Sequence, residues 1–169
     1  MWKLLSFTVL VLFICWPKEA RLVSRPISSL SGAAKMASYV LLVDFTENGQ
    51  ALQEMMKNTQ RKQNITTVVI REILHWRQDW TQAQLKNPLI PSVKDNSGNL
   101  RVLPSPMIQP GQKIRISFDR TAYKITDPSA TQGIVLLSTS LPQDGIFFCE
   151  LDFAILPISD KNEILNGVQ

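Results

Sequence analysis

The chain has 169 residues, with two cysteines, one histidine and a formal net charge of +4 from 18 Lys and Arg against 14 Asp and Glu. Five of the basic residues and one of the acidic residues lie within residues 1–35, so the remainder carries 13 of each sign and is formally neutral. A domain without an excess of Lys and Arg lacks the usual signature of nucleic-acid binding, and the single cysteine beyond residue 35 excludes an intrachain disulfide there.

Residues 1–35 have the pattern of a targeting leader. Lys3 precedes an apolar run from Leu4 to Trp16, which is much shorter than the roughly 20 residues of a spanning helix. A basic start and a short apolar core are typical of an export signal, so we expect a secreted or exported protein. Two alternatives stay open. The Arg- and Ser-rich stretch 21–35 resembles an organelle transit segment, which would make the leader bipartite, and translation from Met36 would give a cytoplasmic protein.

Residues 36–157 are expected to form one globular domain, followed by a loosely attached tail at 158–169. In its first half, SYVLLVDF (38–45) has the length and composition of a strand, and ALQEMMKNTQRK (51–62) is rich in helix formers. Residues 64–86 are ambiguous. Their β-branched opening favours a strand, but Val69, Ile73, Trp76 and Trp80 recur at helical spacing, and we predict a helix over 67–86.

The second half is expected to be mainly β-structure. Residues 87–112 contain five prolines and predict loops, with LRVL (100–103) as a short edge strand. Strands are predicted at 113–118, at 133–140 and over 146–156, the last two joined as a hairpin with Cys149 facing the core. The predicted fold class is therefore α+β, mainly an antiparallel sheet or sandwich, with one or two helices in the N-terminal half.

Chemical motifs are sparse. His75 is the only histidine, so a site with several histidine ligands is excluded. His75 and Asp79 would share a face of the predicted helix, as a base and its orienting carboxylate do, and a hydrolase using His75 is one alternative. The chain has no Gly-rich phosphate loop, no G-x-S-x-G and no C-x-x-C. We therefore assign no catalytic residue, metal ligand or cofactor, and favour a protein that is not an enzyme.

Recognition chemistry is concentrated at Trp76, Arg77 and Trp80, next to His75. Large aromatic rings beside a guanidinium commonly contact sugars, lipid headgroups or the side chains of a partner protein. At a spacing of four residues on one helix face, the same tryptophans would equally serve as core residues. These four residues are the predicted ligand-binding set.

Four segments in order, YVLLVDFTENGQAL, the tryptophans, IQPGQKIRI and DPSATQG, resemble the pattern of aegerolysins. The resemblance covers about a third of the chain and ends after Gly133, where FFCELDF replaces an aromatic-rich segment. It implies a β-sandwich that binds membrane lipids, and it assigns no residue roles.

Together these patterns predict an exported, non-enzymatic binding domain with no transmembrane span once the leader is removed. Its partner could be a protein, a glycan or a lipid headgroup, whereas the charge balance argues against nucleic acid.

Overall fold

The computed structural model describes residues 29–57 and 63–169. The helices are α1 (Leu30–Met36), α2 (Gly49–Lys57) and α3 (Lys161–Val168), with the short 3-10 helices η1 (Gln84–Lys86) and η2 (Ile158–Asp160). The main-sheet strands are β1 (Tyr39–Phe45), β2 (Asn64–Trp76), β5 (Lys113–Phe118), β6 (Gln132–Leu137), β7 (Ile146–Cys149) and β8 (Ile155–Leu156). A separate two-stranded sheet contains β3 (Ser92–Lys94) and β4 (Leu100–Val102).

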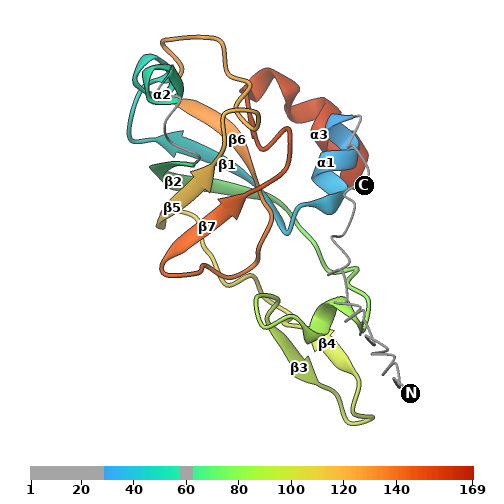
Figure 1. The fold of residues 1–169 in the computed structure, drawn as a ribbon. Helices are drawn as coiled ribbons and strands as arrows, with labels where there is room; N and C mark the ends of the chain where they lie inside the picture. Colours follow the sequence, from blue (N-terminus) through green and yellow to red (C-terminus); the bar gives the residue numbers. More distant parts are fainter. Residues whose placement is uncertain (1–28, 58–62) are drawn as a thin grey trace, which may run out of the picture.

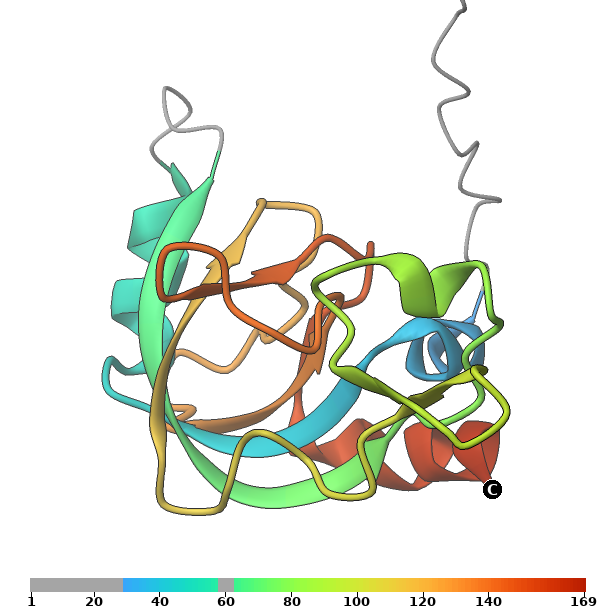
Figure 2. The same ribbon diagram turned by 90° about the horizontal axis from the view of Figure 1, so that it is seen from below.

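The six-stranded sheet has the order β7-β5-β2-β1-β6-β8 and curves into a nearly closed barrel (Figures 1 and 2). All neighbours are antiparallel except β5 and β7, which run parallel. The ends of β6 and β7 are brought together where the Ser138 amide donates to the Phe148 carbonyl at 2.8 Å. The fold is thus α+β, as predicted, and its main sheet is largely antiparallel, but this sheet includes one parallel pair and curves into a nearly closed barrel instead of forming a flat sheet or a sandwich.

The barrel interior is filled by apolar side chains from both halves of the chain. Tyr39, Leu41, Ile116 and Leu137 are each fully buried there. The outer face of β1 and β6 is also buried, and the α1–α3 pair lies on this side of the sheet, as Figure 2 shows. Lys161 at the start of α3 pairs with Glu72 of β2 at 3.4 Å on the surface.

The helix predicted over 67–86 is wrong, because residues 64–76 form the long strand β2. Two β-bulges interrupt its pairing with β1. The residues of β2 that pair with the inward side chains of β1 are Val68, Ile70, Ile73 and Trp76. Each bulge adds one residue to β2, so the inward spacing changes from two residues to three. Apolar residues three apart imitate helical periodicity, which explains the error.

The predicted hairpin of residues 133–156 is also not formed. β7 ends at Cys149 and pairs in parallel with β5, while β6 pairs with β1 and β8. Residues 150–153 make a turn instead of continuing the strand. Cys149 nevertheless faces the core as predicted, with 1% of its surface exposed. Period-two alternation therefore identified the inward residues without identifying the partner strand.

Both chain segments that the sequence separates from the domain take part in the fold. Residues 29–35, assigned to the leader, form the N-cap Ser29 and all of α1 except Met36, and Ala33 and Ala34 are fully buried. The rest of the predicted leader, residues 1–28, lies outside the described residues. Residues 158–168, predicted to be a loose tail, form η2 and α3, and Ile164 is fully buried. A Cβ on Gly167 would lie 2.4 Å from the Cβ of Ser31, so the two helices cross at a glycine. Small residues allow this close packing, and composition alone does not reveal it.

The remaining predictions agree better with the structure. The helix expected at 51–62 corresponds to α2 as far as Lys57, and residues 58–62 lie outside the described residues. The strands expected at 38–45 and 113–118 correspond to β1 and β5. The proline-rich stretch forms an arm in which β3 and β4 project away from the barrel (Figure 1). Gln82 caps the free edge of β4, since its side-chain amide both donates to and accepts from the backbone of Leu100.

Candidate functional site

A pocket of about 580 Å³ lies where α1, the end of β2 and the end of α3 meet. Its lining consists of Lys35, His75, Trp76, Gln78, Asp79 and residues 167–169. This volume lies within the range of small-molecule sites, roughly 300–1,000 Å³. The pocket therefore brings together three segments that are distant in the sequence, and it contains two of the four predicted ligand-binding residues.

Lys35 reaches the pocket because of how α1 packs. Ala33 and Ala34 point into the core, which leaves the next residue, Lys35, on the exposed side of the last turn. Lys35 makes no ion pair with the residues that the structure describes. The pocket thus contains an ammonium group that the fold itself does not use.

Trp76 forms a rigid wall of the same pocket. Its ring stacks on Tyr39, with centroids 6.4 Å apart and planes 12° from parallel. The hydroxyl of Tyr39 in turn accepts from the Met107 amide at 3.1 Å, and burial raises the pKa of this tyrosine. The indole Nε1 of Trp76 is buried with no partner among the described residues. The ring is therefore held in place from the barrel side before any ligand arrives.

His75 lies beside Trp76 and pairs with Val40 on the outer face of the sheet. Partial burial lowers its pKa, and the positive charge of Arg77 acts in the same direction, while Asp79 opposes both. A histidine whose ordinary pKa is about 6.5 is then neutral at pH 7. In this state, one ring nitrogen donates a hydrogen bond and the other accepts one.

Arg77 and Trp80 belong to a separate turn and do not line the pocket. The Arg77 guanidinium lies 4.1 Å from the centroid of the Trp80 ring, and its Nε donates to Asp79 at 2.9 Å. The Trp80 indole donates to the Arg77 carbonyl at 3.0 Å. Only 11% of the Arg77 side chain is exposed, so these contacts stabilise the turn that leads into the arm. The predicted set is therefore split into a pocket pair, His75 and Trp76, and a structural pair, Arg77 and Trp80.

Among the described residues, the pocket offers His75 no hydroxyl or thiol side chain to activate. Its lining contains no Ser, Thr or Cys side chain. Burial raises the pKa of Cys149 far above its ordinary value, with the nearby Glu150 acting in the same direction, so this thiol is unreactive. Within residues 29–57 and 63–169, no three His, Cys, Asp or Glu side chains are close enough together to hold a metal ion.

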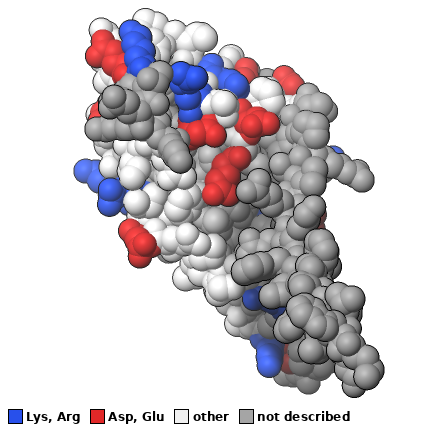
Figure 3. Space-filling view, viewed as in Figure 1, with Lys and Arg blue, Asp and Glu red and all other residues white. Residues whose placement is uncertain are grey.

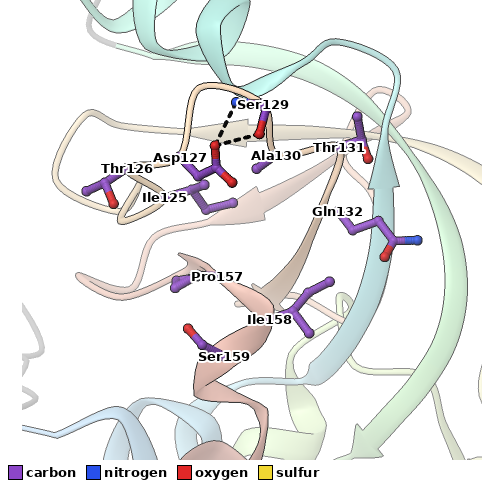
Figure 4. A pocket seen from close by; sticks show the side chains of 10 residues that line it. All are labelled: Ile125, Thr126, Asp127, Ser129, Ala130, Thr131, Gln132, Pro157, Ile158 and Ser159. Atoms are coloured by element: carbon purple, nitrogen blue, oxygen red, sulfur yellow. Dashed lines mark hydrogen bonds between the residues drawn. The ribbon is translucent and has the colours of Figure 1, made fainter.

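A second pocket, of about 510 Å³, lies between the β5–β6 connection and η2 (Figure 4). Residues 125–127, 129–132 and 157–159 line it. No sequence pattern predicted this pocket, because hydroxyl-bearing loop residues carry no spacing signal. Lys35 and residues 167–169 were not predicted as site residues either, since they were assigned to the leader and the tail.

Comparisons of the chain with protein-family models, with curated proteins and with solved structures give no match. Among the helices of the described residues, none has the length and apolar character that a membrane crossing requires. On the face shown in Figure 3, basic and acidic side chains lie near one another, and neither sign covers a broad area.

Proposed function

We propose that the chain is an exported, non-enzymatic binding domain whose ligand occupies the pocket of Lys35, His75 and Trp76. One observation carries this proposal: the fold brings an unpaired ammonium, a neutral imidazole and an immobilised indole ring to one concave site. Convergent polar groups beside an aromatic wall are typical of ligand sites. Three segments that are far apart in the sequence supply them.

The lining favours a ligand with an acidic group and a flat apolar part. Lys35 supplies a positive charge, whereas the carboxylate of Asp79 already accepts a hydrogen bond from Arg77. A carboxylate, sulfonate or phosphate on the ligand would pair with Lys35 and accept a hydrogen bond from His75. A ring on the same ligand would lie against Trp76.

The case for export comes from the sequence of the leader. Residues 29–36 are part of the fold, so we expect the leader to be cleaved before them. Ser29 caps α1, and Ala33 and Ala34 are buried in the core. We infer that a processed chain keeps residues from Ser29 onward. Translation from Met36 would remove both the helix and Lys35, which argues against the cytoplasmic alternative.

The two other functions stay predictions. A hydrolase using His75 would have to activate water, because the described lining contains no Ser, Thr or Cys side chain. Lipid binding of the aegerolysin type would need tryptophans that reach outward, but Trp76 is stacked on Tyr39 and Trp80 lies under Arg77.

The test uses 2-naphthoate as the probe and 2-naphthamide, which has the same shape without the charge, as the control compound. Binding is measured by isothermal titration calorimetry. At about −0.3 kcal/mol per non-hydrogen atom, a ligand of this size binds with a Kd near 1 mM. We expect the naphthoate to bind about fivefold more tightly than the amide, because a charge-assisted hydrogen bond at an open site contributes about 1 kcal/mol.

Lys35→Gln should remove this preference, and Lys86→Gln, which changes an exposed lysine of the arm, should keep it. Equal affinity of the wild-type protein for the two compounds would contradict the proposed ligand class. Loss of the preference in both variants alike would show that net charge, and not Lys35, is responsible.

A further inference from the structure

The pocket in Figure 4 shares no residue with the Lys35 pocket and lies toward the other end of β1. Gln132 of its lining pairs with Asp44, while Trp76 of the Lys35 pocket pairs with Tyr39. The two pockets therefore have separate linings, and the inference below does not rest on the proposed function.

The loop that forms one wall is fixed by its main chain. Its carbonyls at Pro128 and Ala130 accept from the first amides of α2, those of Gln50 at 2.9 Å and Gly49 at 2.8 Å. The Thr131 carbonyl accepts from the Phe45 amide at 2.8 Å. These carbonyls are already hydrogen-bonded to α2 and β1. The loop therefore contributes its side chains to the pocket. A site of fixed shape loses less entropy when a ligand binds.

Asp127 is the only charged residue of this lining. Its Oδ1 accepts from the amide of Ser129 at 2.8 Å and from the hydroxyl of Ser129 at 2.7 Å. These two bonds lower the pKa of Asp127, so the carboxylate is ionised at neutral pH. In Figure 4, the second carboxylate oxygen points away from Ser129, and it has no partner among the residues drawn.

Apolar surface completes the site. Ile158 is 40% exposed, one of five large apolar side chains of the described residues that are exposed, and Pro157 and the buried Ile125 also line the pocket. The hydroxyl groups of Ser159 and Thr131 add hydrogen-bond acceptors on either side. An alkyl chain could therefore cover the isoleucine while a charged end reaches Asp127.

We propose that this pocket binds a lysine side chain of a partner polypeptide, with the ammonium on Asp127 and the methylene chain on Ile158. Charge complementarity selects a cation, since no Lys or Arg is present in the lining. Arginine fits less well, because its planar fork is best matched by both oxygens of a carboxylate, and Ser129 already occupies one of them. The compact ammonium needs only the remaining oxygen and nearby hydroxyls.

The test is an amide chemical-shift titration of the protein with Nα-acetyl-lysine N-methylamide. The expected shifts concentrate on the amides of residues 126–132, except Pro128, and on Ile158 and Ser159. The norleucine analogue has a similar chain without the charge and should bind at least fivefold more weakly. The arginine analogue should also bind more weakly than the lysine compound.

Asp127→Asn is the matched variant, because its side-chain oxygen can still accept from Ser129 while the charge is lost. It should abolish the preference for lysine over norleucine, and Asp144→Asn, at an exposed turn of the β6–β7 connection, should preserve it. Equal binding of lysine and norleucine in the wild-type protein would overturn the proposal whatever the variants do. Tighter binding of arginine than of lysine would overturn the choice of side chain.

Discussion

The two pockets lie toward opposite ends of β1 and have opposite chemistry. The pocket of Lys35, His75 and Trp76 offers a cation and an aromatic wall, whereas the other offers a carboxylate and an aliphatic wall. A formally neutral domain can thus carry two sites of opposite charge preference. A net charge of zero excludes an excess of one sign over the whole domain, but it says nothing about such local sites.

The walls of the two pockets are also built differently. Helix packing forms the wall of the Lys35 pocket, since α1 and α3 cross where Gly167 contacts Ser31. Backbone hydrogen bonds form the second, since the loop 125–131 is held by the first turn of α2. Changes to α1 should therefore affect the first pocket alone, and changes to the start of α2 should affect the second alone.

The largest effect is expected from shortening the chain. A chain that starts at Ser29 keeps α1 and should unfold at the same urea concentration as the longer protein. A chain that starts at Met36 loses the buried Ala33 and Ala34 and uncovers the side chains that α1 covers, such as those of α3. Its unfolding free energy should fall by about 3 kcal/mol or more. Equal midpoints for the two chains would show that α1 adds nothing to the fold.

A smaller and more local effect is expected from Gly49→Ala. In an open helix position, this change would stabilise by about 0.5–1 kcal/mol. Here the new Cβ would lie 2.3 Å from the carbonyl oxygen of Asp127, so the loop must move. We expect a loss of about 1–3 kcal/mol in unfolding free energy, measured by urea denaturation.

The same variant should shift the amides of residues 126–132, except Pro128, and leave those of His75 and Val168 unchanged. Gln50→Ala, an exposed change on the same turn, is the control and should alter neither set of amides. A Gly49→Ala protein that is more stable than the wild type would mean that the loop does not contact α2 as described.

The smallest effect concerns pH and the first pocket. The folded state lowers the pKa of His75, so the unfolded chain takes up its proton at a higher pH than the folded chain does. Stability is then complete above the ordinary histidine pKa of about 6.5 and declines as the pH falls below it, until the folded pKa is passed. His75→Asn should make the urea midpoint depend less on pH between about 7.5 and 5.5. If the urea midpoint depended on pH identically in the wild-type protein and the variant, His75 would not be responsible for the pH dependence.

The sequence predicted strands with a regular alternation of buried and exposed residues. It did not predict features that depend on how the strands pair with one another. Alternation at residues 113–118 identified β5 and its inward face, because a strand with one buried face needs nothing else to be recognised. β2 was mistaken for a helix because Val69, Ile73 and Trp76 recur at helical spacing. A bulge sets the inward residues Ile73 and Trp76 three apart, whereas Val69 pairs with Asp44 on the other face of the strand. Bulges depend on the curvature of the whole sheet, so a local sequence pattern does not predict them.

The candidate sites divide in the same way. His75 and Trp76 stood out because histidine is unique in the chain and tryptophan is rare. Their neighbours Arg77 and Trp80 were predicted with them. The chain turns after the end of β2, so these two residues lie outside the pocket lining. Lys35 and Asp127 carried no signal, since their roles depend on helix packing and on a loop held by distant amides.

The most direct test of the ligand site is the indole Nε1–H signal of Trp76 during titration with 2-naphthoate. The signals of Trp76 and Trp80 can be assigned from Trp76→Phe and Trp80→Phe, and Trp80 serves as an internal reference because it lies outside the lining. We predict that the Trp76 indole shifts together with the amides of His75 and Val168 while the Trp80 indole stays in place. Shifts confined to other parts of the barrel, with the Trp76 indole unmoved at saturation, would contradict the account.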